Sequence, residues 1–189
     1  MLAPVRTEAP DETPVSLDEV KLHCRVDFDD DDLLLEALIG AATAHLEKIL
    51  DIAIVTQSWR QDFGSFEYLR LPKDPVQEDG LIVEYRDAEN QQQTLSSSTY
   101  RLLADSQSSY VAVEPGSQWP QVYRRPDAVS VFFVAGTPVD EVPLSLKAAI
   151  LLHVGHLYQN REAVTVDAVS NFLPLGYEAL IWPFKKVGV

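Results

Sequence analysis

Cysteine is almost absent from this sequence, and no long apolar run is present. The one cysteine, Cys24, cannot form an internal disulfide, which excludes the disulfide-stabilised class of small secreted domains. The most apolar stretch, Leu146 to Tyr158, contains His153 and His156 and is too short to cross a bilayer. No basic segment followed by an apolar one opens the chain. We therefore expect a soluble protein of a reducing cytosol, with no membrane partner.

Basic residues are also scarce. The chain has 15 lysines and arginines against 29 aspartates and glutamates, a formal net charge of -14. A surface of this sign repels phosphate, so DNA binding through counterion release is not expected. Two interpretations of the charge remain open. It serves solubility alone, or the chain is an acidic inhibitor that mimics DNA for a basic partner.

Catalytic motifs are missing. The sequence has no glycine-flanked serine, no phosphate-binding loop and no dinucleotide glycine motif. His153 and His156 are three positions apart, whereas a zinc peptidase needs histidines four apart with a glutamate between them. We predict no catalytic residue, no cofactor and no enzyme activity. A hydrolase remains a third class, but it needs a nucleophile or metal site that the sequence does not provide.

The aspartate run 27–32 resembles a calcium loop only in part. Asp27, Asp29 and Asp31 have the spacing of the first, third and fifth ligands. Asp32 stands where the turn needs glycine, and Leu38 stands where a bidentate glutamate belongs. We predict no metal site and interpret the run as the acidic start of a helix, favoured by the helix dipole.

The apolar content of 46% over 189 residues is enough for one domain with a real core. Residues 1–13 are rich in proline and lack an apolar period, which predicts a flexible leader. Ser16 and Glu19 form a capping-box pattern, which predicts a short helix to about Arg25. A second helix should run to about Leu50. We expect its buried stripe to comprise Leu34, Leu38, Ala41, Ala42, Leu46 and Ile49.

Residues 52–135 change character, because β-branched and aromatic residues occur there in short runs between turn residues. This predicts an antiparallel β module with Asp87 to Gln93 as a polar hairpin connection. The expected strands are Ile54 to Phe63, Glu67 to Leu71, Leu81 to Arg86, Tyr100 to Leu103, Tyr110 to Val113 and Val129 to Val134.

After Gly136 the pattern returns to helices. Pro143 suits a first helical turn, and the apolar residues that follow predict a core helix from Val142 to about Asn160. Leu175 to Ile181 is a last short helix. The predicted fold class is α+β: N- and C-terminal helices (16–50 and 142–181) form one bundle, with the β module (52–135) inserted. The domain spans 14–181, and 182–189 is a basic tail.

Phe132 and Phe133 are adjacent in a predicted strand, so one ring must face away from the core. We predict a subunit interface at this pair, on the outward ring.

A set of short segments follows one another in a characteristic order and spacing over nearly the whole chain. They are Pro14 to Lys21, Arg25 to Asp27, Asp31 to Leu34, Thr56 to Trp59, Gly116, Trp119-Pro120, Val129, Val131, Phe133, Gly136, Pro143, Leu146 to Leu152, Gly155 to Tyr158, Arg161-Glu162, Pro174 to Gly176 and Leu180. Together these segments, from Pro14 onward, resemble the phage head-tail connector (adaptor) family of siphophages, prophages and gene transfer agents.

The resemblance implies a dodecameric ring that binds the portal protein on one side and a stopper or tail-completion protein on the other. DNA would pass through its channel without specific binding. It also implies a place in the neck of a virion or virus-like particle, after assembly in the bacterial cytoplasm. One departure is the tail, where Lys185-Lys186 stand in place of an arginine-bearing end.

The tail combines aromatic and cationic residues, which are common anchors at protein interfaces. We expect Trp182, Phe184, Lys185 and Lys186 to bind the portal. The alternative is a frayed end that packs on the chain's own core.

Overall fold

The computed structural model describes residues 2–160 and 175–186. Arg161, Glu162 and Pro174 of the resemblance, and residues 187–189 of the predicted tail, lie outside the described residues. The described part of the chain divides into two compact units, a helical unit (12–50, 138–160 and 175–186) and a β unit (2–11 and 51–137). The α+β composition is as predicted, and the two units match the predicted helical bundle and inserted β module.

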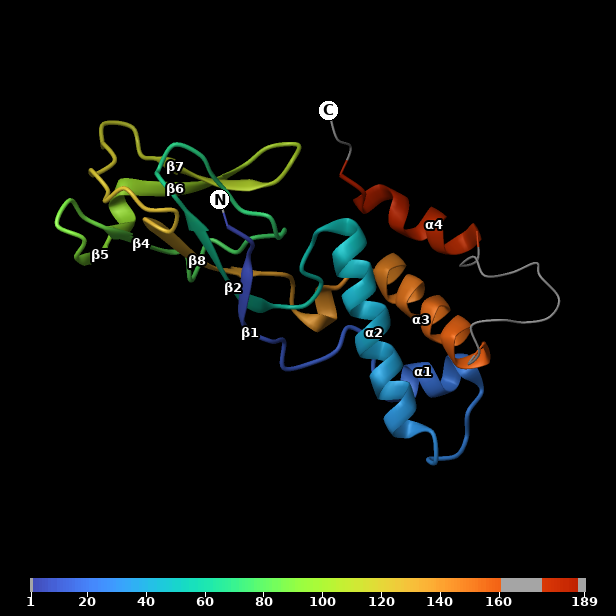
Figure 1. Ribbon diagram of the computed structural model, residues 1–189. Coiled ribbons are helices and arrows are strands. Elements are labelled where there is room, and N and C mark those ends of the chain that lie inside the picture. The colour runs from blue at the N-terminus through green and yellow to red at the C-terminus, as the bar shows by residue number, and fades with distance from the viewer. Residues whose placement is uncertain (1, 161–174, 187–189) are drawn as a thin grey trace. The chain divides into compact units, whose positions relative to one another are not determined.

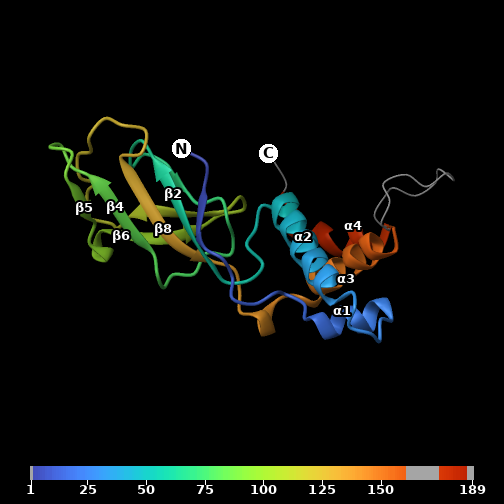
Figure 2. The ribbon, with the colours of Figure 1, turned by 60° about the horizontal axis from the view of Figure 1, so that its bottom comes forward.

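The helical unit is built from both ends of the chain. Its helices are α1 (Leu17–Cys24), α2 (Asp32–Leu50), α3 (Leu144–Gln159) and α4 (Leu175–Ile181), with short 3₁₀ turns η2 (Val139–Glu141) and η3 (Trp182–Phe184). In Figures 1 and 2, α2 and α3 lie side by side, and α4 packs on α3. The predicted helix bounds agree with these to within a few residues.

The capping box forms as predicted. The Ser16 hydroxyl accepts a hydrogen bond from the Glu19 amide at 3.1 Å, and the Glu19 carboxylate accepts one from the Ser16 amide at 2.7 Å. These two bonds satisfy amides that a helix start leaves unpaired, so α1 begins at Leu17. At the other end, Arg25 adopts the left-handed conformation that commonly ends helices.

The predicted buried stripe of α2 is wrong in part. The buried residues are Leu35, Ile39, Ala42, Leu46 and Leu50, at spacings of three and four. Ala42 and Leu46 were predicted correctly. The predicted Leu34, Ala41 and Ile49 are exposed, and Leu38 is half-buried. The helix has apolar residues on both faces. The apolar pattern alone therefore fits two possible buried stripes, one shifted along the sequence by one position from the other.

The β unit contains two antiparallel sheets (Figure 2). The five-stranded sheet has the order β1-β2-β8-β4-β5 and the three-stranded sheet the order β3-β7-β6. The strands are β1 (Val5–Glu8), β2 (Gln57–Phe63), β3 (Leu69–Arg70), β4 (Ile82–Arg86), β5 (Gln92–Thr94), β6 (Tyr100–Ala104), β7 (Ser109–Val113) and β8 (Val129–Ala135), with a 3₁₀ turn η1 (Ser97–Thr99).

Residues from both sheets form one core. Val83, Val131 and Phe133 of the five-stranded sheet belong to the same buried cluster as Leu69 and Val111 of the three-stranded sheet. At the end of β8, Gly136 has a φ of +99°, and a Cβ atom there would collide with the carbonyl of Val55. Only glycine fits this close approach of two backbones.

The leader prediction is wrong for Val5–Glu8. This segment forms β1, which pairs antiparallel with β2 at one edge of the sheet. The Leu2 amide also donates to the Asp62 carbonyl at 2.9 Å, and the Gln61 side chain donates to the Leu2 carbonyl at 2.6 Å. All four side chains of β1 are exposed, so backbone hydrogen bonds hold it and no apolar pattern marks it in the sequence.

Candidate functional site

The outer face of the five-stranded sheet has an aromatic ring at its centre. Side chains alternate along β8: Val129, Val131, Phe133 and Ala135 are buried, and those between them are half-exposed. Phe132 therefore points to the outer face. Its neighbours across the sheet are Arg60 on β2 and Ile82 on β4. Together these three form a row with an apolar centre.

Charged residues of both signs surround this row. A guanidinium nitrogen of Arg60 lies 3.3 Å from the Asp62 carboxylate, which also accepts a hydrogen bond from the Ser130 hydroxyl at 2.7 Å. Part of the face is hollowed to a volume of about 250 Å³. The hollow is lined by Arg60, Asp62, Glu84, Tyr85, Arg86, Gln92, Asp127, Ala128, Ser130 and Phe132. An apolar centre with a polar rim is the usual composition of a protein–protein interface. We call these lining residues, together with Ile82, the sheet face.

The structure separates the two phenylalanines predicted at a subunit interface. Phe133 is 1% exposed and belongs to the chain's own core, opposite Trp59. Phe132 is half-exposed at the sheet face. The interface role therefore applies to Phe132 alone, and it stays a prediction.

The predicted portal-binding residues lie at the end of α4 and in η3. Tyr177 and Ile181 are buried and anchor α4, whereas Trp182 is 70% exposed. Phe184 and Lys185 are half-buried, and Lys186 is exposed. The structure thus brings an outward tryptophan and two lysines together at one end of the helical unit. Their contact with a portal stays a prediction.

Lys185 has two partners within the chain that the sequence analysis missed. Its ammonium lies 2.6 Å from the Glu178 carboxylate and 5.6 Å from the centre of the Trp182 ring. The second contact is in the range of a cation–π interaction. Glu178 and Lys185 are seven positions apart, across the helix end, where helical spacing gives no signal. These contacts place the Lys185 ammonium beside the exposed Trp182 ring.

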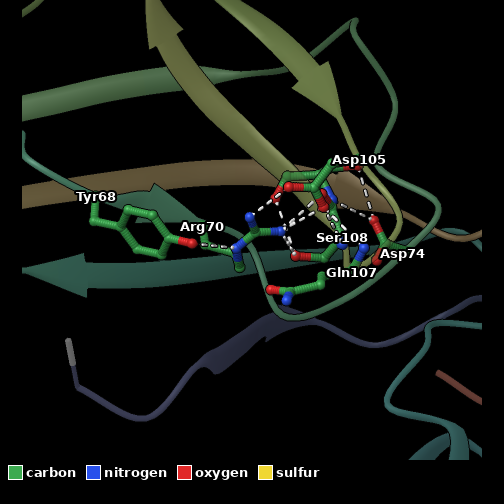
Figure 3. Close-up of polar contacts among 7 residues, drawn as sticks. Tyr68, Arg70, Asp74, Asp105, Gln107 and Ser108 are labelled. Atoms are coloured by element: carbon green, nitrogen blue, oxygen red, sulfur yellow. Dashed lines mark hydrogen bonds and ion pairs between the residues drawn. The ribbon is translucent and has the colours of Figure 1, made fainter. Parts of the chain in front are cut away.

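A polar clamp closes the β6–β7 hairpin (Figure 3). Arg70 on β3 donates two hydrogen bonds to the Asp105 carboxylate, at 2.8 and 2.6 Å, in a bidentate arrangement. It also donates to the Tyr68 hydroxyl at 3.2 Å. The amides of Gln107 and Ser108 donate to Asp105 as well, at 2.8 and 3.1 Å. We call Tyr68, Arg70, Asp105, Gln107 and Ser108 the hairpin clamp.

The hairpin clamp also shifts the ionisation of its members. The bond from Arg70, with the two amide bonds, holds the pKa of Asp105 well below its usual value, and Asp105 raises the pKa of Arg70. The guanidinium lies between the rings of Tyr68 and Tyr110, 5.4 and 5.5 Å from their centres. The clamp thus presents a fixed hairpin tip at the surface of the β unit.

The aspartate run does precede a helix, as predicted. The Lys21 ammonium lies 2.6 Å from Asp29 and 2.7 Å from Asp32, and holds the pKa of Asp29 below its usual value. The Tyr158 hydroxyl donates to Asp31 at 2.5 Å. These contacts join the run to α1 and α3, a structural use of the carboxylates that the sequence analysis did not predict.

The residues considered for chemistry lie apart. Cys24 is half-buried, and burial raises the pKa of its thiol, which keeps it protonated. His153 is buried and His156 is half-buried on α3. Over residues 2–160 and 175–186, no three histidine, cysteine, aspartate or glutamate side chains are grouped as metal ligands. In the same residues, every helix is too short or too polar to traverse a lipid bilayer.

The described residues thus present three surface features: the sheet face, an exposed aromatic-basic end and a fixed hairpin tip. The sequence model of the phage gp6-like head-tail connector proteins matches residues 14–106. No curated protein is significantly similar in sequence to the chain.

Solved structures show the same fold over the whole chain. A chain of the virion of a native gene transfer agent particle has 22% sequence identity and a TM-score of 0.82, with 100% of this chain and 97% of that chain covered. Chains of two neck structures have the same identity and coverage. Their TM-scores are 0.80 for the empty particle, computed with C6 symmetry, and 0.73 for the native particle, computed with C12 symmetry. The chain is thus similar to the phage head-tail connector family over residues 14–106, and it has the fold of these particle chains over its whole length.

Proposed function

We propose that this chain is a structural head-tail connector subunit, and not an enzyme, that forms a dodecameric ring in the neck of a virion or virus-like particle. Two findings agree and together carry the proposal. The family match is to head-tail connector proteins, and the whole chain has the fold of a chain in a particle neck. The ring would bind the portal on one side and a stopper or tail-completion protein on the other. An acidic DNA-mimicking inhibitor finds no support in either comparison.

Cryo-electron microscopy of particles that contain the chain tests this function. We expect density for twelve copies at the junction of head and tail, with a central channel. Density for the chain at any other place in the particle would contradict the proposal. Assembly in the bacterial cytoplasm is part of the same proposal, and it predicts that the chain accumulates in uninfected expression hosts without export.

For the ring contact we propose the sheet face. A ring needs two different patches on each subunit, because copies meet head to tail. Phe132 and the 47% exposed Ile82 provide apolar area at the centre of one such patch, with Arg60 and Glu84 as a charged rim. The charged rim favours one registration of the neighbouring copy over others.

The test is a comparison of Phe132→Ser with Leu22→Ser, since Leu22 is an 83% exposed leucine of α1 in the helical unit. We expect Phe132→Ser to fold as the parent does but to lose ring assembly, measured by mass photometry and by incorporation into particles. Leu22→Ser should assemble as the parent does. Normal rings of the Phe132→Ser chain would refute the sheet face as the contact.

For portal binding we propose the exposed end of the helical unit. Trp182 is exposed although it is a large apolar ring, and its contact with Lys185 holds it outward. Tryptophan at such a position is a common binding hot spot. DNA would pass the ring without specific contacts, because the chain is strongly acidic.

Deletion of residues 182–189 tests the anchor. Because Tyr177 and Ile181 carry the buried contacts of α4, we expect the truncated chain to keep its circular dichroism spectrum. We expect it to lose co-sedimentation with purified portal protein. Trp182→Ala should lose most of the binding on its own, whereas Glu178→Gln, which removes only the ion pair with Lys185, should retain it. Unchanged portal binding of the truncated chain would count against the anchor.

A further inference from the structure

Three aromatic rings from three helices are in contact in the helical unit: the exposed His45 and the buried His153 and Tyr177. His153 on α3 lies between His45 on α2 and Tyr177 on α4. The ring centres of His45 and His153 are 4.9 Å apart with an interplanar angle of 66°, and those of His153 and Tyr177 are 5.7 Å apart at 72°. Both pairs have the edge-to-face geometry that attracts aromatic rings. His153 thus links α4 to the pair α2–α3.

The inner two rings are buried, and each has a polar atom with no hydrogen-bond partner in the part of the chain that the structure describes. His153 is 8% exposed and Tyr177 is 1% exposed. Among the described residues, neither Nδ1 of His153 nor the hydroxyl of Tyr177 makes a hydrogen bond to the protein. A neutral imidazole tolerates such a site. An imidazolium would have no acceptor for its Nδ1 proton, so burying the charged ring there would cost far more free energy than burying the neutral ring.

The charges around His153 also oppose its protonation. Burial lowers the pKa of His153 below its ordinary value, and positive charge on His45 and His156 lowers it further. On α1, His23 packs against α3, with Nε2 3.2 Å from where a Cβ of Gly155 would lie. On α4, Glu178 follows Tyr177, but its carboxylate is paired with Lys185 at 2.6 Å. Positive charge on His45 and His156 therefore adds to the cost of charging His153.

We propose that His45, His153 and Tyr177 form a protonation-sensitive latch: the neutral rings hold α4 on α3, and proton uptake by His153 releases α4 together with Trp182 and Lys185. This inference goes beyond the proposed connector function and does not depend on it. The partner that operates the latch is the proton itself.

The direction of the pH effect follows from the lowered pKa. The released state binds the proton at the ordinary histidine pKa of 6.5, and the latched state binds it only at lower pH. The latch is therefore fully closed above about pH 6.5 and weakens as the pH falls below that value. For each unit by which the latched state lowers the pKa of His153, the equilibrium constant for closing the latch falls by at most about tenfold at low pH.

Hydrogen exchange of the full chain, read by mass spectrometry at pH 7.5 and pH 5.0 and corrected for the intrinsic rates, tests the latch. We expect α4 (Leu175–Ile181) to lose protection at pH 5.0, while β2 and β8 keep theirs. His153→Phe should keep α4 protected at both values. His23→Gln removes an exposed histidine of the same unit and should behave as the parent does.

Two results would overturn the latch. One is equal protection of α4 at pH 7.5 and pH 5.0 in the parent chain. The other is a loss of protection in His153→Phe as large as in the parent. If His153→Phe does not fold, His153→Gln, which is neutral and closer in polarity, is judged by the same criterion. Tyr177→Phe keeps the ring without the buried hydroxyl, and we expect it to retain the pH dependence. If Tyr177→Phe loses the pH dependence, the result would contradict the claim that His153 takes up the proton.

Discussion

At the scale of single residues, Phe132 and Phe133 show how one position along a strand changes the role of a side chain. The two rings are chemically identical and adjacent. The alternation of β8 places Phe133 in the core and Phe132 on the sheet face. Sequence reasoning predicted that one ring faces outward but could not decide which, because the alternation has no fixed phase until the neighbouring strands are known.

Replacing each phenylalanine with alanine should give different costs. Phe133→Ala leaves a cavity in the β unit, and we expect a loss of about 3–5 kcal/mol in the free energy of unfolding. Phe132→Ala removes a half-exposed ring, and we expect a loss of about 1 kcal/mol. Urea unfolding followed by circular dichroism measures both. Equal losses would mean that the two rings are equally buried.

Asp105 gives a prediction about pH. Its folded pKa lies below the ordinary value of 3.8, so the hairpin clamp contributes stability above that pH and loses it as the pH falls through the folded pKa. Asp105→Asn has no such titration. We expect the parent chain to be more stable than Asp105→Asn at pH 5 to 7, and the difference in urea midpoint to shrink as the pH falls below 3.8. A difference that is independent of pH would exclude the Asp105 carboxylate as its source.

At the scale of elements, local signals predicted α1, α3 and α4 and most strands. The capping box, the proline before α3 and the β-branched runs act over a few residues, so the sequence contains them directly. β1 was missed because its side chains are all exposed. The hairpin clamp was missed because Arg70 and Asp105 are 35 positions apart, and only the pairing of β3 with β7 brings them together.

The α2 helix shows the limit of apolar periodicity, and a pair of alanine substitutions can test it. Leu35 is fully buried, and its neighbour Leu34 is 36% exposed. We expect Leu35→Ala to lower the free energy of unfolding by about 2–5 kcal/mol. Leu34→Ala should cost less than about 1 kcal/mol. Thermal melts of the helical signal compare the two. If Leu34→Ala lowered the free energy of unfolding more than Leu35→Ala does, the result would support the buried stripe predicted from the sequence.

At the scale of the whole molecule, the net charge of -14 opposes electrostatic binding of DNA. The cationic groups that the structure describes at Lys21, Arg70 and Lys185 are paired with carboxylates within the chain. They are therefore poor candidates for phosphate contacts. A channel built from such subunits would favour sliding of the duplex over binding.

We predict that the purified chain does not retain duplex DNA even at about 50 mM salt, where electrostatic binding is strong. A gel-shift titration with a short duplex measures this, with a basic DNA-binding protein as positive control. A complex that forms at low salt and dissociates at high salt would show a cationic surface that the net charge conceals.

The order of segments along the chain has a consequence for synthesis on the ribosome. β1, α1 and α2 emerge first, but α3, the main packing partner of α2, emerges only after the whole β module. Until then α1 is the only helix available to cover the residues of α2 from Leu35 to Leu50 that become buried, whereas the β module can complete its sheets as soon as β8 appears. The nascent chain therefore carries a largely uncovered apolar helix for much of its translation, which exposes α2 to chaperones and to premature aggregation.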